Sequence, residues 1–218
     1  MIVYGSSMSP FVRKVLMFAA EKGIEIELKA HGLQSTDPEF REASPFGLMP
    51  GFRDGDFAIS DSSAIVAYLE AIKPEPALIP AEPRSRARAI WWDEVADTVF
   101  TNCMRKMFFN RVVSPMFLKK PGNLAEADHA QANELPPLID FLEERIPESG
   151  FLVDDRLTLA DIAMVQPFVN FGHVGCAIDA VRHPKVSAYL AAIHARPSLA
   201  SWIKREQAFF EKVRQETK

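Results

Sequence analysis

Cysteine is scarce in this chain of 218 residues, and the two that occur, Cys103 and Cys176, stand far apart. Their spacing fits neither a zinc site nor a CxxC redox motif. Without a disulfide framework, we expect two reduced, mostly packed thiols and a reducing compartment. Neither cysteine is predicted to act as a nucleophile, and no metal site is expected.

Long hydrophobic runs and an excess of positive charge are also missing. No segment reaches the roughly 20 apolar residues of a membrane-spanning helix, and no cationic segment precedes an apolar stretch near residue 1. The formal net charge is -4 and the pI is near 5.8. The most basic stretch, residues 84–88, is interrupted by small residues, and we interpret it as a solvated helix face. We therefore expect a cytoplasmic protein that binds neither nucleic acid nor a membrane.

A hydrophobic content of 48% is enough for one large core or two modest ones without a structural staple. A proline-rich segment begins at residue 73 and cannot continue a helix, so it is interpreted as a semi-rigid linker. The predicted organisation is a first domain over 1–76, a linker over 77–83 and a second domain over 84–218.

The opening residues predict a buried strand followed directly by a helix. Residues 1–4 form a β-branched and aromatic run that ends at Gly5. Pro10 has the fixed φ that suits the first position of a helix, which makes Ser9 the N-cap. Apolar residues at helical spacing extend this helix to Gly23.

Two roles are open for Ser9. As a simple N-cap, its hydroxyl accepts a hydrogen bond from a backbone amide and contributes about 1 kcal/mol. Alternatively, the hydroxyl and the helix N-terminus hold an anion such as a thiolate, whose thiol pKa falls from about 8.5 toward neutrality. Ser9 is a poor nucleophile, because no base stands at a usable spacing. Ser6 and Ser7 remain candidates for a share in this role.

The rest of the first domain follows an α/β pattern. Residues 24–30 alternate apolar and charged side chains, so we expect a strand that pairs in parallel with the first. Pro50 ends a rigid turn where a cis bond fits. An Asp-Gly pair within 53–56 predicts a hairpin. Asp61 or Ser62 then caps a second helix.

Asp61 and Ser62 are also candidates for ligand binding. A helix N-terminus with a serine hydroxyl can receive a carboxylate, and the Asp61 carboxylate can pair with an ammonium group. Together the two residues fit the charged ends of a γ-glutamyl amino acid, and capping of the helix is the alternative role for both.

Segments with a helical repeat fill the second domain. Apolar rows that begin at Trp91 and Trp92 run along one long helix toward Phe109. A helix over 126–145 contains two adjacent prolines, which should kink or interrupt it. The large aromatic residues are expected to be mostly core, with a few lining an apolar cleft between the domains: Trp91, Trp92, Phe100, Phe108, Phe109, Phe117 and Phe210.

Thr158 is predicted to cap a further helix, and Asp161 three residues later completes a capping-box variant. Two more amphipathic helices are expected over 183–197 and 198–217. The predicted fold class is an α/β domain followed by an all-α domain.

Three motifs, taken in order, resemble those of the cytosolic glutathione transferase superfamily, and the resemblance covers nearly the whole chain. The similarity is to the serine-type members, a theta-, phi-, tau- and zeta-like bacterial branch. It implies a thioredoxin-like glutathione-binding domain, an all-helical domain with a hydrophobic co-substrate site, and a homodimer. The motifs are Ser9-Pro10-Phe11-Val12-Arg13-Lys14-Val15, the segment 44–50 and the segment 61–65.

The resemblance also implies roles for individual residues. Ser9 would stabilise the glutathione thiolate, and Met49, before a cis Pro50, would pair through its backbone with the cysteine of glutathione. Asp61, in place of the more common glutamate or glutamine, and Ser62 would bind the γ-glutamyl end.

The function that follows is detoxifying transfer of the glutathione thiolate to a hydrophobic electrophile. A non-catalytic glutathione-binding or assembly module is an alternative, as are a glutathione-dependent isomerase, dehalogenase, ether-cleaving enzyme or peroxidase. A thiol-disulfide reductase needs a cysteine where Ser9 stands. Ser44 and Leu48 differ from the asparagine and the amide or lysine of many relatives, which leaves some glutathione contacts open.

Overall fold

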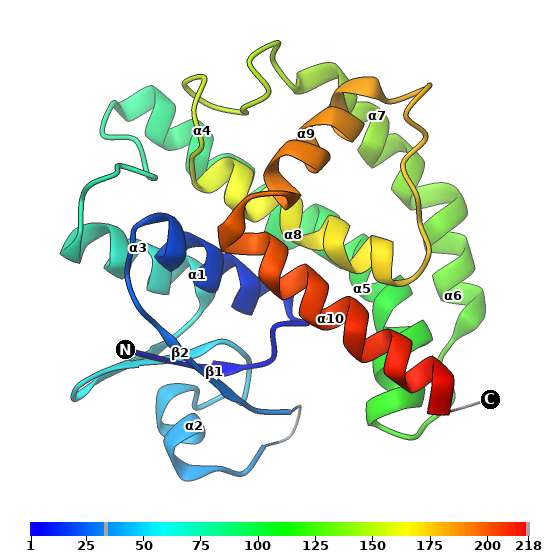
Figure 1. Cartoon of the computed structure of the whole chain (residues 1–218), viewed down its shortest axis with the longest axis horizontal. Helices are drawn as coiled ribbons and strands as arrows, with labels where there is room; N and C mark the ends of the chain where they lie inside the picture. The colour runs from blue at the N-terminus through cyan, green and yellow to red at the C-terminus, as the bar shows by residue number, and fades with distance from the viewer. Residues whose placement is uncertain (33–34, 217–218) are drawn as a thin grey trace.

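The computed structural model describes residues 1–32 and 35–216 (Figure 1). The predicted fold class, an α/β domain followed by helices, is confirmed. The first part contains β1 (Ile2–Gly5), α1 (Pro10–Glu21), β2 (Glu27–Ala30), α2 (Pro38–Ala43), β3 (Gly51–Asp54), β4 (Phe57–Ser60) and α3 (Ser62–Ile72). The second part contains α4 (Pro83–Glu94), η1 (Val95–Phe100), α5 (Thr101–Phe108), η2 (Phe109–Phe117), α6 (Leu124–His129), η3 (Ala130–Glu134), α7 (Leu135–Arg145), α8 (Leu159–His173), α9 (Pro184–His194) and α10 (Pro197–Glu216).

The sheet has the strand order β2-β1-β3-β4. β1 pairs in parallel with β2, as predicted, and antiparallel with β3, where Val3 lies opposite Phe52. Successive side chains of a strand point to opposite faces, so Val3 joins the main core while Tyr4 packs with Phe40 of α2. Figure 1 shows α1 and α3 on one side of the strands and α2 on the other.

One predicted strand of this sheet has different limits in the structure. The second strand covers Glu27–Ala30 rather than 24–30, because the Ile24 amide donates to the Ala19 carbonyl at the end of α1 (2.8 Å). The hairpin between β3 and β4 is confirmed. Gly55, at φ +61°, supplies the left-handed conformation that its two-residue loop requires.

An irregular segment, 73–82, connects α3 to α4. It contains prolines that end the helical pattern, and the domain limits 1–76, 77–83 and 84–218 stay a prediction. The basic stretch 84–88 lies in the first turns of α4 with its arginines exposed, in agreement with a solvated helix face.

The first four helical elements of the second part form one continuous helix that includes the π-helical segments η1 and η2. One predicted apolar row is buried, and Trp91 and Val99 on the other row are 48% and 45% exposed. Most of the large aromatic residues are core, as expected: Trp92, Phe100, Phe108 and Phe210 are buried, whereas Trp91, Phe109 and Phe117 are exposed. That a few of them line an apolar cleft stays a prediction.

The proline pair at 136–137 lies in the first turn of α7, directly after the π-helical η3. The predicted interruption takes this form because proline has no N–H to donate to the preceding turn. The last predicted helix is α10, and Thr217, its expected end, lies outside the described residues. None of the helices among residues 1–32 and 35–216 is long and apolar enough to cross a membrane.

α8 is the central helix of the molecule and packs against both α1 and α4. Every side chain from Leu159 to Phe171 is buried. The predicted capping box is present: an Asp161 carboxylate oxygen accepts the Thr158 amide (2.9 Å), and the other accepts the Leu152 amide (2.8 Å). A single apolar cluster therefore joins the two parts through α8.

Candidate active site

The residues predicted to bind the ligand extend from one row of the sheet. Tyr4 at the end of β1 lies opposite Gly51 at the start of β3, and Gly51 lies opposite Ser60 at the end of β4. Beyond this row the chain continues to Ser9 from β1 and to Asp61 from β4, while Pro50 precedes β3. The antiparallel pairing therefore brings all three motifs to the same edge of the sheet.

Ser9 has the backbone conformation of an N-cap, with φ −78° and ψ 126°, and its carbonyl accepts the Arg13 amide (3.0 Å). Its hydroxyl, however, makes no capping hydrogen bond to any amide of the described chain, so the simple capping role is not observed. The side chain is partly exposed. The first turn, which begins with Pro10, also carries no acidic residue. The positive end of the helix dipole thus remains available to an external anion.

The residues before Ser9 form a turn that we call the serine loop (residues 6–9). The Ser9 amide donates to the Ser6 carbonyl (2.9 Å), and the Met8 amide donates to the Ser6 hydroxyl oxygen (3.3 Å). Ser6 is therefore engaged in shaping the turn. The Ser7 hydroxyl makes no hydrogen bond within the described residues, and its share in the role of Ser9 stays a prediction.

The Met49-Pro50 peptide bond is cis, as predicted. The turn before Pro50 packs closely against the end of β1. A Cβ on Gly5 would lie 3.1 Å from Met49 Cβ and 2.7 Å from Val12 Cγ2. Gly5 also has φ +152°. Gly5 is thus required for close packing, whereas the sequence pattern marked it only as the end of a strand.

Asp61 is the N-cap of α3, and its Oδ1 accepts the amides of Ser63 (2.9 Å) and Ala64 (3.0 Å). Capping is therefore one real role of this carboxylate. Its Oδ2 makes no hydrogen bond to another described residue and remains free for a ligand. Asp61 has φ +80°, a strained conformation that is enriched at functional sites. Ser62 follows as the first residue of α3 and is 4% exposed.

The two cysteines lie in the second part of the chain and are not suited to nucleophilic attack. Both cysteines are free thiols; burial raises the pKa of Cys103 to about 12 and also raises that of Cys176. A thiol that stays protonated is a poor nucleophile. No group of three His, Cys, Asp or Glu side chains within the described ranges is arranged to hold a metal ion.

Two family models match this chain. One describes the N-terminal domain of glutathione S-transferases and matches residues 3–77, and the other describes their C-terminal domain and matches residues 96–206. The chain belongs to the glutathione S-transferase family. It is a transferase enzyme with glutathione as its co-substrate.

Individual relatives agree over nearly the full length. A glutathione S-transferase of Hyoscyamus muticus is 30% identical over 214 residues, which cover 95% of this chain and 99% of the relative. Human glutathione S-transferase theta-1 is 28% identical over 94% of this chain and 82% of its own. The structure of glutathione S-transferase I bound with lactoylglutathione superposes with a TM-score of 0.81 at 24% identity, covering 93% of this chain and 98% of that one.

Lys14 supports the second helix N-terminus of this transferase, a contact that the sequence analysis missed. Its ammonium group lies 2.8 Å from Asp93 Oδ1 and 2.5 Å from Asp97 Oδ2, and it donates to Ser63 Oγ (3.1 Å). Desolvation raises the pKa of Asp97 to about 6, against the attraction of Lys14. Desolvation lowers the Lys14 pKa, but the two carboxylates outweigh it, so that pKa is raised. One cation is thus shared by two carboxylates below α3.

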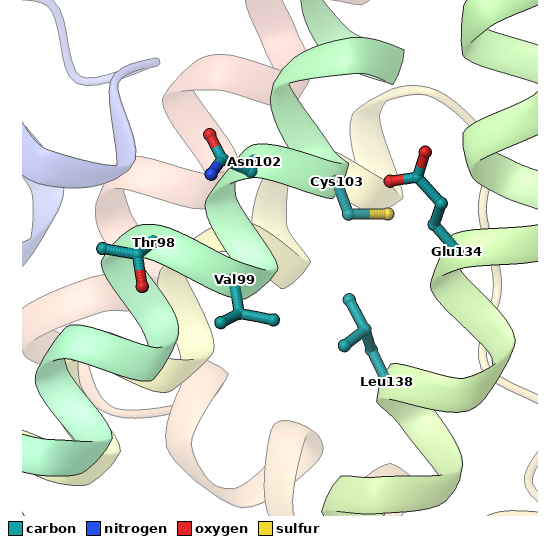
Figure 2. Close-up of a pocket in the computed structure, with 6 residues that line it drawn as sticks. All are labelled: Thr98, Val99, Asn102, Cys103, Glu134 and Leu138. Atoms are coloured by element: carbon teal, nitrogen blue, oxygen red, sulfur yellow. The ribbon is translucent and has the colours of Figure 1, made fainter.

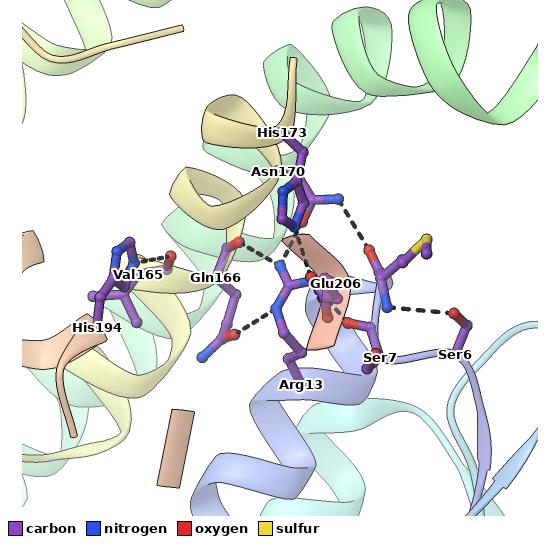
Figure 3. Close-up of polar contacts among 10 residues, drawn as sticks. Ser6, Ser7, Arg13, Val165, Gln166, Asn170, His173, His194 and Glu206 are labelled. Atoms are coloured by element: carbon purple, nitrogen blue, oxygen red, sulfur yellow. Dashed lines mark hydrogen bonds and ion pairs between the residues drawn. The ribbon is translucent and has the colours of Figure 1, made fainter. Parts of the chain in front are cut away.

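Arg13 anchors the serine loop of the transferase to the helical part (Figure 3). Its fully buried guanidinium donates to the Ser7 carbonyl (2.7 Å) and lies 3.1 Å from Glu206 Oε2 on α10. It also donates to the Gln166 carbonyl (2.8 Å) and to Asn170 Oδ1 on α8. No sequence pattern predicted this network. The available signal was a pair of polar residues, Gln166 and Asn170, four apart in the otherwise apolar middle of α8.

Proposed function

We propose that this transferase joins the glutathione thiolate to a hydrophobic electrophile, and that Ser9 and the N-terminus of α1 stabilise the thiolate. The glutathione sulfur loses its proton to solvent and attacks the electrophilic carbon, and a leaving group departs with its bonding electrons. The uncapped hydroxyl of Ser9, at the start of a helix whose first turn has no acidic residue, carries this proposal. A donated hydrogen bond and the helix dipole both favour the anionic form of sulfur.

The remaining glutathione contacts follow the same edge of the sheet. We place the cysteine backbone of glutathione beside Met49 and the cis Pro50, and the γ-glutamyl carboxylate at Ser62 and the α3 amides. Its ammonium group would lie at Asp61 Oδ2, the oxygen that capping leaves free. These assignments are supported by the shared edge, which brings the segments before β3 and after β4 to the serine loop.

A hydrophobic co-substrate site is proposed next to the serine loop, at Phe117 and Phe209. Their rings stack at a centroid distance of 6.1 Å and an angle of 11°, yet the side chains are 48% and 37% exposed. Phe209 follows Glu206 on α10, and Glu206 reaches Arg13 below the serine loop. Half-exposed aromatic rings at this position suit an apolar electrophile.

We propose a homodimer in which Phe46 of each copy enters a cavity of the other. Phe46 is 84% exposed on the segment before Pro50. An open cavity of about 420 Å³ lies on the second part of the chain, between η1 with the start of α5 and η3 with the start of α7 (Figure 2). In a twofold dimer both copies make the same contact. The cavity is lined by Thr98, Val99, Asn102, Cys103, Glu134 and Leu138.

Analytical ultracentrifugation tests this dimer with Phe46→Ala. We expect the monomer fraction to rise strongly, and Leu48→Ala, in the same segment at 70% exposure, to be the matched control. An unchanged sedimentation coefficient for Phe46→Ala would count against the contact.

We also propose a cytoplasmic, detoxifying role, which the free thiols of both cysteines support because a reducing compartment maintains them.

Ultraviolet titration of the bound thiol tests the role of Ser9. The wild-type complex should show thiolate absorbance at neutral pH, and Ser9→Ala should raise the pKa of the bound thiol by about 1 to 2. We expect kcat/KM with an aromatic halide to fall about ten- to a hundredfold, while Tm stays constant because the hydroxyl makes no capping bond. Ser9→Thr, which keeps the hydroxyl, is the control.

Each other outcome has a defined meaning. A wild-type complex whose sulfur stays protonated at neutral pH would refute the thiolate mechanism. Glutathione binding without turnover of any tested electrophile would favour the non-catalytic module. Isomerase, dehalogenase, ether-cleaving or peroxidase activity would retain the thiolate mechanism and replace only the electrophile.

A further inference from the structure

We propose that Asn170 is a positioning residue that holds the serine loop, and with it the Ser9 hydroxyl, from the helical part of the molecule. The proposal rests on the proposed function of Ser9. It assigns a part in thiolate stabilisation to a side chain on α8 that does not itself line the glutathione edge of the sheet.

The Asn170 side chain acts on the peptide that carries Ser9. Its Nδ2 donates to the Met8 carbonyl at 2.9 Å, and the Met8 carbonyl carbon is bonded to the Ser9 nitrogen. Asn170 is 0% exposed, so water does not compete for this hydrogen bond. Its Oδ1 accepts from Arg13, which fixes the amide with its N–H groups toward the loop.

Arg13 in turn is held on every side (Figure 3). A guanidinium has five N–H groups, and all are used: Nε contacts Gln166 Oε1 (3.3 Å), Nη1 contacts the Ser7 carbonyl and Glu206, and Nη2 contacts the Gln166 carbonyl and Asn170. The partly exposed serine loop is thus fixed at two successive carbonyls by two fully buried donors.

The opposite end of α1 provides a built-in comparison. There Glu21 accepts two hydrogen bonds from Arg196, both at 2.7 Å, and one from Ser198. This second contact also joins α1 to the helical part, because Arg196 directly precedes α10. It lies at the far end of α1 from the serine loop, so its loss affects docking without touching the Ser9 peptide.

A hydrogen bond from Ser9 to sulfur depends on the position of the hydroxyl, and displacements of about 1 Å at a reacting group can cost about a hundredfold in rate. Loss of the Asn170 donor frees the Met8-Ser9 peptide to move. We therefore expect the bound thiol to become harder to ionise, while the γ-glutamyl contacts at α3 are retained. Turnover should suffer more than glutathione affinity.

The test compares Asn170→Asp with Arg196→Ala. Asn170→Asp keeps an oxygen for Arg13 and removes the donor to Met8. We expect the pKa of bound glutathione to rise by about 1 and kcat at neutral pH to fall about tenfold, with KM for glutathione within about twofold of wild type. Arg196→Ala should lower Tm and leave that pKa unchanged.

Amide hydrogen exchange of residues 6–9 gives a second readout that needs no glutathione. We expect faster exchange there in Asn170→Asp and in Asn170→Ala, and wild-type exchange in Arg196→Ala. An unchanged thiol pKa in a folded Asn170→Asp, or an equal rise in Arg196→Ala, would overturn the proposal. A wild-type enzyme that binds no thiolate would instead refute the proposed function, while faster loop exchange would still report the Asn170 contact.

Discussion

The helices α1 and α8 both begin with a hydroxyl side chain at the N-cap, yet the two termini differ in burial and in how their polar groups are satisfied. Thr158 of α8 is fully buried, and Asp161 at the third helical position accepts its amide. In α1 the third helical position is Val12, and Ser9 is partly exposed with an unused hydroxyl. A carboxylate three residues along satisfies a helix terminus from within, whereas an apolar residue there leaves the terminus for a ligand.

The N-terminus of α3 is intermediate between these two. Asp61 caps the helix with one carboxylate oxygen and keeps the other free, and Ser63 is tied to Lys14 and Asp93 below it. One side chain there can serve both the helix and a ligand, because a carboxylate offers two acceptor oxygens.

Substitution of the N-cap residue of α1 or of α8 by cysteine would test the difference between these two helix termini most directly. In Ser9→Cys the helix N-terminus should lower the thiol pKa, and the thiolate should attack oxidised glutathione to form a mixed disulfide and release one glutathione thiolate. We expect transferase kcat/KM to fall about a hundredfold or more. Thr158→Cys, fully buried, should not react. Mass spectrometry measures the mixed disulfide in both variants. Equal modification of the two cysteines would contradict the difference between the two helix termini.

Removal of the internal carboxylate should unfold the satisfied terminus. Asp161→Ala leaves the buried amides of Leu152 and Thr158 without their acceptor, and we expect a loss of about 3 kcal/mol or more in the free energy of unfolding. Thr158→Ser keeps the hydroxyl and the box, and it should cost less. Urea denaturation measures both variants. A loss below about 1 kcal/mol for Asp161→Ala would show that water replaces the carboxylate.

A pH dependence is expected from Asp97, beside Lys14. Burial raises its pKa from 3.8 to about 6 in the folded protein. Because the folded-state pKa is higher than the unfolded-state pKa, the contribution of Asp97 to the free energy of unfolding is greatest at low pH. This contribution is lost as the pH rises through about 6. Asparagine does not titrate, so the free energy of unfolding of Asp97→Asn minus that of wild type should increase by about 1 kcal/mol from pH 5 to pH 8. Urea denaturation at both values measures the gain, and a pH-independent difference would contradict it.

The smallest expected effect separates the two duties of Asp61. Asp61→Asn keeps a capping oxygen and tolerates the positive φ, so Tm should hold while KM for glutathione rises a few-fold from the lost charge. Asp61→Ala removes the cap as well and should cost about 1 kcal/mol. Calorimetry and initial rates measure the two effects. A fall in Tm for Asp61→Asn equal to that for Asp61→Ala would show that the charge itself stabilises α3.

Local patterns predicted the fold and the segments that meet at one edge of the sheet, while the roles of the site residues stay predictions. Pro10 marked the start of α1, Asp-Gly marked the hairpin, and the Thr158/Asp161 pair marked the start of α8, because each acts over a few residues. The predicted strand 24–30 was too long because the Ile24 amide donates its hydrogen bond to the end of α1 instead of to a neighbouring strand.

Contacts between segments that are distant in the sequence could not be predicted from local patterns. Arg13 and Lys14 read as two charges in a motif, but Arg13 reaches α8 and α10 while Lys14 reaches α3 and α4. Only the three-dimensional arrangement places these partners, which lie up to 193 residues away along the chain. The unused hydroxyl of Ser9 could not be predicted either, since N-cap serines usually do cap.

The guanidinium of Arg13 has a consequence for how separable the two halves of the molecule are. Of its partners, the Ser7 carbonyl alone belongs to the first 76 residues, and the others come from α8 and α10. Without the second part of the chain, the first part would expose this cation to solvent, and the segment before α1 would lose the Asn170 hydrogen bond to Met8. The position of the serine loop therefore depends on helices of the second part of the chain.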